Sequence, residues 1–133
     1  MMNRRHVMYG LVLLVLAVGL RLTAIYHVGI EVDEPVNWEV SQFISENGYP
    51  GIKGQLGGDP EVALFHPAFG FQLVAEWFTI TGNHSLVAAR MVSVFSSVLA
   101  IVMITVLVWK TISPQAGLIV LLLLSTDGWL VTT

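Results

Sequence analysis

Two adjacent carboxyl residues, Asp33 and Glu34, are the first side chains in this sequence whose type and position could do chemistry. They follow a long apolar run and directly precede a helix-start signal at Pro35. Neighbouring carboxylates repel each other, so one of the two holds a proton more readily than an isolated acid does. One of them is therefore a candidate general base. The alternative is an ordinary helix N-cap with an acid matched to the helix dipole.

Three further residues are candidates for binding a ligand. His66 precedes Pro67 at the start of a second apolar stretch, where an imidazole and a helix N-terminus together favour an anion such as a phosphate. Arg21 lies late in the first apolar run and either reaches outward to headgroups, pairs with the acidic loop of residues 28–61, or contacts a lipid phosphate. Trp38 falls opposite the apolar stripe of a predicted helix, where it either stacks on a ligand or sits in the aromatic belt of a membrane interface.

The composition excludes several other kinds of site. The chain has no cysteine, which removes disulfides, thiolate metal sites and a cysteine nucleophile. Its six Lys and Arg residues and net charge of -3 argue against nucleic-acid binding, which needs a basic face. Asp33, Glu34 and His66 offer oxygen and nitrogen ligands to a divalent metal, but their spacing does not identify a metal site. We therefore assign no metal ligands and no certain cofactor.

The elements that must position these residues are membrane helices. The chain is 55% hydrophobic, which excludes an ordinary soluble monomer. Four apolar stretches, over residues 7–26, 62–80, 88–109 and 115–133, predict about four transmembrane helices in an all-α membrane protein. Arg4 and Arg5 place the N-terminus in the cytoplasm, which in a prokaryote makes this the plasma membrane. Residues 1–27 then form the N-terminus and first membrane helix, and residues 62–133 form three more.

Between these parts lies an outer loop, residues 28–61, with seven acidic residues against Lys53 alone. Inside it, residues 35–47 predict an amphipathic helix at the membrane interface, because Val36, Val40, Phe43 and Ile44 share one face. The pattern ends at Asn47-Gly48, a common helix stop.

Charges in the later apolar stretches need partners. With four alternating helices, Glu76 and Arg90 reach the same level near the cytoplasmic side, so we expect them to form an ion pair there. The same topology makes residues 81–87 a cytoplasmic turn. The glycosylation sequon at Asn83 would not be glycosylated there. Asp127, in the last stretch, requires a partner helix or a break in its own helix.

The order of these motifs resembles the N-terminal part of GT-C membrane glycosyltransferases, in particular glycosyltransferase family 39, with the protein O-mannosyltransferases, and the lipid A aminoarabinose transferase. The likeness covers roughly residues 4–117. It rests on an arginine-flanked first helix, an outer acid pair, a Gly-rich segment, a His-Pro motif, a short turn and an arginine opening the third helix: Arg4, Arg5, Asp33, Glu34, His66, Pro67, Gly82, Asn83, His84 and Arg90.

The resemblance implies a partial GT-C architecture and transfer of a sugar, with inversion, from a membrane polyprenyl-phosphate carrier to an acceptor on the non-cytoplasmic face. It implies that Asp33 takes the proton from the acceptor hydroxyl or helps to orient it, and that Glu34 supports the site. His66, in the position of the family's His-Pro or Lys-Pro motif, then donates to the leaving phosphate. Some enzymes of this kind use a divalent metal.

Family members continue through many more membrane helices, whereas this sequence stops at Thr133. We therefore expect the chain alone to be inactive and to need further helices of the same or a partner chain. One alternative is a small non-catalytic membrane protein that binds a polyprenyl or anionic lipid or scaffolds a partner. Another is part of a transporter in which Glu76 and Asp127 relay ions.

Overall fold

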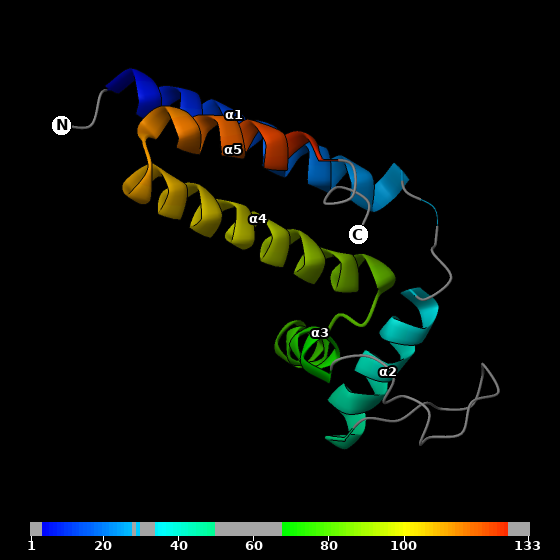
Figure 1. The fold of residues 1–133 in the computed structure, drawn as a ribbon. Helices are drawn as coiled ribbons and strands as arrows, with labels where there is room; N and C mark the ends of the chain where they lie inside the picture. Colours follow the sequence, from blue (N-terminus) through cyan, green and yellow to red (C-terminus); the bar gives the residue numbers. More distant parts are fainter. Residues whose placement is uncertain (1–3, 28, 30–33, 50–67, 128–133) are drawn as a thin grey trace. The chain divides into compact units, whose positions relative to one another are not determined.

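The computed structural model describes residues 4–27, 29, 34–49 and 68–127, and within them the chain is helical without strands. Five helices follow one another along the sequence (Figure 1): α1 (Arg4–His27), α2 (Glu34–Asn47), α3 (Ala68–Thr81), α4 (Leu86–Thr111) and α5 (Pro114–Thr126). They divide into two compact units, residues 1–28 with 93–133 and residues 29–92. The expected all-α class is thereby confirmed.

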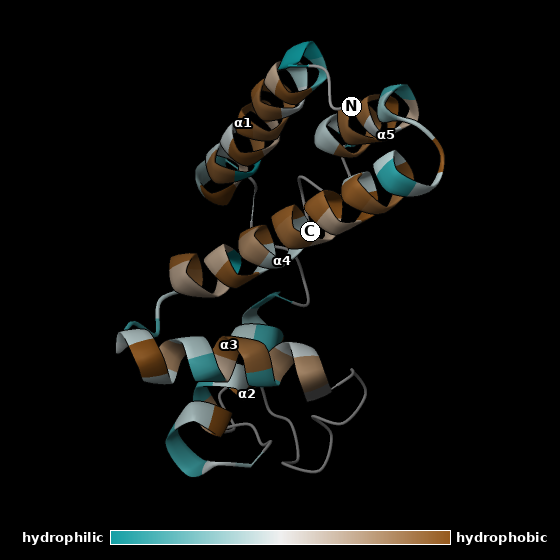
Figure 2. Ribbon diagram, turned by 90° about the vertical axis from the view of Figure 1, so that its left-hand side faces the viewer, coloured by the Kyte–Doolittle hydropathy of each residue, from teal (hydrophilic) through white to brown (hydrophobic). Residues whose placement is uncertain are grey.

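Two of the helices, α1 and α4, are long and apolar enough to cross a membrane. They have 24 and 26 residues, and apolar residues predominate along both (Figure 2). These two helices indicate association with a membrane. The described parts of α3 and α5 have 14 and 13 residues, fewer than the roughly 20 that a bilayer requires. Four membrane spans are therefore not shown, and the expected second span enters the described residues only as the short helix α3.

In the first unit, α5 packs against α1 and follows α4 after a short turn. Ser113 caps α5 by accepting a hydrogen bond from the amide of Ala116, and Pro114 occupies the first turn, where its missing N–H is harmless. Gly117 then allows α5 to approach α4 closely. A Cβ atom at Gly117 would lie 3.0 Å from Cβ of Trp109 and 3.3 Å from the Thr105 carbonyl oxygen.

In the second unit, α2 packs against α3. Val40 and Ile44 of α2 contact Phe71 and Ala75 of α3 in a small buried core, with Val36 at its edge. The observed helix starts one residue before the expected range 35–47 and ends at Asn47 as expected. Gly48 follows with a φ of 78°, the left-handed conformation that terminates many helices.

One member of the predicted apolar stripe of α2 points elsewhere. Phe43 makes an edge-to-face contact with Tyr49, at 5.3 Å between ring centroids, and is not part of the core with α3. The stripe is therefore narrower than the sequence pattern implies.

Gly117→Val tests the close approach of α4 and α5. We expect it to lower the free energy of unfolding by about 1–3 kcal/mol, because the added methyl groups meet backbone atoms that cannot move aside. Gly19→Val in α1 is the matched control, since a Cβ there has nothing within 4 Å. Unfolding of both variants in mixed detergent micelles, followed by circular dichroism, measures the difference. Equal effects of the two substitutions would contradict the proposed close contact.

Candidate functional site

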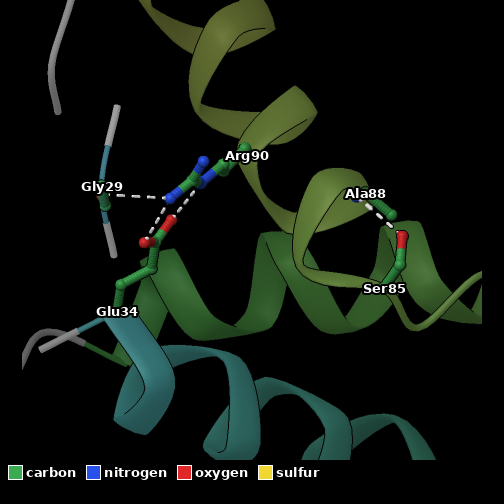
Figure 3. Close-up of polar contacts among 5 residues, drawn as sticks. All are labelled: Gly29, Glu34, Ser85, Ala88 and Arg90. Carbon is green, nitrogen blue, oxygen red and sulfur yellow. Dashed lines mark hydrogen bonds and ion pairs between the residues drawn. The ribbon is translucent and has the colours of Figure 1, made fainter. Parts of the chain in front are cut away.

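The carboxylate of Glu34, the first residue of α2, is held by Arg90 in the second turn of α4. Arg90 Nε donates to Glu34 Oε1 at 2.5 Å, and Nη2 donates to Oε2 at 2.8 Å. Nη2 also donates to the Gly29 carbonyl oxygen at 3.3 Å. Figure 3 shows this arrangement, in which one guanidinium joins the segment after α1, the start of α2 and the start of α4.

This ion pair is partly buried and bidentate. The side chains of Arg90 and Glu34 are 17% and 22% exposed. Paired N–H donors on a carboxylate form stronger and better oriented bonds than a single contact does, and an acid at a helix N-terminus is further favoured by the dipole. A carboxylate engaged in this way is a weaker base. Glu34 is therefore suited to fix the start of α2, directly after Asp33 in the chain.

The predicted ion pair between Arg90 and Glu76 is wrong. Glu76 lies on an exposed part of α3, where its Oε1 accepts a hydrogen bond from Gln72 Nε2 at 3.0 Å. The prediction assumed that α3 crosses the membrane and carries both charges to one depth. The described α3 instead exposes Glu76, and Arg90 pairs with Glu34, 56 residues earlier.

Trp38 is tied to the turn between α3 and α4. Its indole Nε1 donates to the His84 carbonyl oxygen at 2.7 Å, and the His84 ring stacks on Phe78 with centroids 5.2 Å apart. Packing thus occupies the polar atom of the indole, which favours a structural role over stacking on a ligand. The turn was expected on the cytoplasmic side and α2 in the outer loop, but the structure places the turn against α2.

The turn itself is well defined by local bonds. Gly82 has a φ of 65°, and Asn83 Oδ1 accepts a hydrogen bond from the amide of Ser85 at 3.1 Å. Ser85 caps α4, since its Oγ accepts from the amide of Ala88 at 3.2 Å (Figure 3). Together these bonds set where α4 begins and hence where Arg90 stands.

Arg21 belongs to the first unit and is 1% exposed. Its Nη1 donates to the Ala17 carbonyl at 3.1 Å and its Nε to Ser97 Oγ of α4 at 3.1 Å. Its Nη2 donates to the Leu124 carbonyl at 3.0 Å, in the last turn of α5, where carbonyls lack partners within the helix. Arg21 therefore does not reach outward to headgroups. Instead it caps the C-terminus of α5, where a cation also complements the helix dipole.

Asp33 and His66, the predicted base and phosphate ligand, lie outside the described residues, so their approach to Glu34 remains a prediction. Within the described ranges there is no group of three or more His, Asp or Glu residues that could hold a metal ion. The functional residue that spacing alone missed is Arg90 as the partner of Glu34. The sequence feature that pointed to Arg90 was the family resemblance, in which this arginine begins the third apolar helix.

Arg21→Ala tests the role of this arginine in the helical unit. We expect a loss of about 2–4 kcal/mol in the free energy of unfolding, because bonds from a charged donor contribute roughly 1.5–3 kcal/mol each and do not add fully. Arg21→Lys should lose part of this, since one ammonium cannot reach both Ser97 and Leu124. Detergent unfolding titrations measure both values. The exposed Arg4→Ala is the control and should change stability by less than about 0.5 kcal/mol.

A double-mutant cycle with Glu34→Gln and Arg90→Gln tests the ion pair. We expect a coupling energy of about 1–2 kcal/mol in the unfolding titrations, because the two side chains share two hydrogen bonds. The matched cycle of Glu76→Gln with Arg90→Gln should give additive effects. Coupling of Arg90 to Glu76 and not to Glu34 would reverse the pairing described above.

Comparison of the chain with models of protein families, with characterised proteins and with solved structures finds no match. The functional assignment therefore depends on the residues and on the geometry of the second unit.

Proposed function

We propose that this chain is the N-terminal region of an integral membrane glycosyltransferase of the GT-C type. It would move a sugar from a polyprenyl-phosphate donor to an acceptor on the non-cytoplasmic face. The observation that carries the proposal is the ion pair between Glu34 and Arg90. It joins two of the motifs behind the family resemblance, the acid pair of the loop and the arginine of the following helix, although 56 residues separate them.

A third motif belongs to the same unit. The Gly82-Asn83-His84 turn receives the indole N–H of Trp38 through the His84 carbonyl, and it leads directly into α4. Residues that are far apart in sequence thus gather around the start of α2. Such a gathering supports a shared site, because packing alone does not require these particular side chains.

The proposed topology follows from the bond between Arg90 and the Gly29 carbonyl. Gly29 comes two residues after the end of α1, and Arg90 lies in the second turn of α4. If both helices cross the bilayer, the end of α1 and the start of α4 must lie on the same side. With Arg4 and Arg5 in the cytoplasm, that side is the outer one, and Gly29 and the start of α4 lie there.

The proposed chemistry assigns different tasks to the neighbouring acids. The acceptor hydroxyl attacks the anomeric carbon, its proton passes to the Asp33 carboxylate, and the bond from that carbon to the carrier phosphate breaks with the electron pair going to the phosphate. General-base assistance of this kind contributes about 10²–10⁴ in rate. Glu34, held by Arg90, keeps the start of α2 and so Asp33 in position. His66 donates to the departing phosphate, whose charge needs stabilisation.

A second candidate is a non-catalytic protein that binds a polyprenyl or anionic lipid. It is favoured by the engagement of both Glu34 oxygens by Arg90, because such a contact also serves a purely structural purpose. The transporter alternative gains no support from Glu76, whose exposed carboxylate accepts a hydrogen bond from Gln72.

A transfer assay separates the enzyme from the binding protein. Membranes containing the complete gene product would be given a panel of radiolabelled polyprenyl-phosphate sugars, and the loss of sugar from the carrier would be followed over time. We expect turnover of at least one donor and a decrease of about 10²–10⁴ with Asp33→Asn. Glu46→Gln, at the other end of α2, is the control and should keep the activity.

Two results would refute the enzymatic proposal. One is turnover by Asp33→Asn at the rate of the unaltered protein. The other is protection of the protein against heat by polyprenyl phosphate without turnover of any sugar donor, which would establish the binding protein instead.

A further inference from the structure

Three helix ends meet around Trp109 at one end of the first unit. The start of α1 reaches it through His6, whose ring lies edge-on to the indole with centroids 6.4 Å apart. A Cβ atom at Gly10 of α1 would lie 3.7 Å from Trp109 Cζ3, and one at Gly117 of α5 would lie 3.0 Å from Trp109 Cβ. Figure 1 shows the start of α1, the end of α4 and the start of α5 together at this end. We call these contacts of His6, Gly10 and Gly117 with Trp109 the Trp109 junction.

The junction carries cations and no acids. Arg4 and Arg5 begin α1, Lys110 lies in the last turn of α4, and all three side chains are exposed. Helices α1, α4 and α5 contain no Asp or Glu. Arg5 also interacts with another group of the chain, but a guanidinium has five N–H donors and keeps some for a second partner. An anion that balances the charge of these helices must therefore come from outside them.

Apolar side chains border the cations and indicate the class of this anion. On α1, Met8 and Tyr9 are 54% and 51% exposed, and at the end of α4 and just after it Leu107 and Ile112 are 61% and 73% exposed. In a bilayer such side chains contact acyl chains, while the cations at the helix ends reach the headgroups. A free phosphate would satisfy the cations alone. A phospholipid with a net negative charge satisfies both groups, and basic sites between membrane helices bind such lipids.

We propose that the Trp109 junction binds the phosphate of one anionic phospholipid of the bilayer that α1 and α4 cross. Arg5 and Lys110 donate to the phosphate, and the acyl chains lie along Met8 and Leu107. Trp109 lies at the level of the headgroups, where indole rings are common in membrane proteins. This inference needs α1 and α4 to span a membrane. It does not depend on the glycosyltransferase proposal.

The packing at the junction distinguishes a site from a diffuse positive surface. Arg5 adjoins His6 in the chain and Lys110 adjoins Trp109, so the contact between the two rings brings the start of α1 to the end of α4. Cations from distant parts of the chain can then reach the same phosphate. Diffuse attraction to an anionic surface depends on the number of cations and on the salt concentration, not on this packing.

Lipid binding by the full chain tests the proposal. The protein would be purified in a non-ionic detergent and titrated with phosphatidylglycerol or with phosphatidylcholine. Native mass spectrometry would count the lipids retained by each chain and give their dissociation constants. Glycerol 3-phosphate would be added as a competitor that carries the phosphate without acyl chains. Arg5→Gln and Lys110→Gln remove one charge each from the junction, and Lys53→Gln removes the same charge elsewhere in the chain.

We expect one phosphatidylglycerol to bind each chain at least about tenfold more tightly than phosphatidylcholine, since each of the two cations contributes about fivefold. Arg5→Gln and Lys110→Gln should each weaken the binding of phosphatidylglycerol by about that factor. Lys53→Gln should leave it unchanged. Glycerol 3-phosphate should not compete at the concentrations at which the lipid binds.

Gly10→Leu tests the junction without altering any charge. The leucine meets Trp109 and Leu118, whose nearest atoms lie 3.7 and 3.8 Å from the Cβ position, and so moves α1 away from α4. We expect phosphatidylglycerol to bind at least about fivefold more weakly, because the cations no longer converge. Gly19→Leu is the matched control, since a Cβ there has nothing within 4 Å, and it should keep the affinity. Circular dichroism checks that both variants remain helical.

Three outcomes would overturn the proposal. Equal affinity for the two phospholipids would show that the junction does not select a negative charge. Equal losses with Lys53→Gln and Lys110→Gln, or full affinity in a helical Gly10→Leu variant, would show a diffuse attraction in place of a site. Competition by glycerol 3-phosphate at the concentrations of the lipid would show a site for a soluble anion. Sugar transfer enters none of these measurements, so the two proposals fail separately.

Discussion

Among the described residues, the guanidinium of Arg90 donates to both oxygens of the Glu34 carboxylate and to the carbonyl of Gly29, and these bonds organise the second unit. They bring the start of α4 to the start of α2 and to the segment that follows the end of α1. The membrane topology that we propose above depends on this contact. A charge-assisted, bidentate pair is strong enough to impose such a choice where it is partly shielded from water.

In the first unit, a second arginine, Arg21, joins helices by donating hydrogen bonds to neutral groups. Its charge is buried among apolar helices, where an unpaired cation is costly. It donates to two backbone carbonyls and a serine hydroxyl, and the charge of Asp127 attracts it as well. One of these carbonyls belongs to the last turn of α5 and has no partner within that helix. The arginine and the helix end thus satisfy each other. Its engagement by protein groups distinguishes it from an arginine kept for a lipid phosphate.

Local patterns predicted the elements that local chemistry controls. The range 35–47 agrees with α2 to one residue, because Pro35 and Gly48 act on the backbone next to them. Pro114 begins α5 as expected, and α5 ends at Thr126, next to Asp127, where a break was one of two expected outcomes. Of the span expected over residues 62–80, the structure describes the 14-residue helix α3; an apolar stretch of that length is compatible with a membrane helix or with a shorter helix packed on a neighbour.

The amino-acid sequence by itself determined the helical class, the apolar segments, and the helix starts and stops, because these depend on side chains within a few residues of each other. Only the tertiary structure decided that Arg90 pairs with Glu34 and not with Glu76, that Trp38 donates to the turn at His84, and that Arg21 closes α5. A charged side chain accepts any partner of suitable geometry. Which partner comes within reach is set by the packing of helices that are distant in the chain, and periodicity carries no information about that distance.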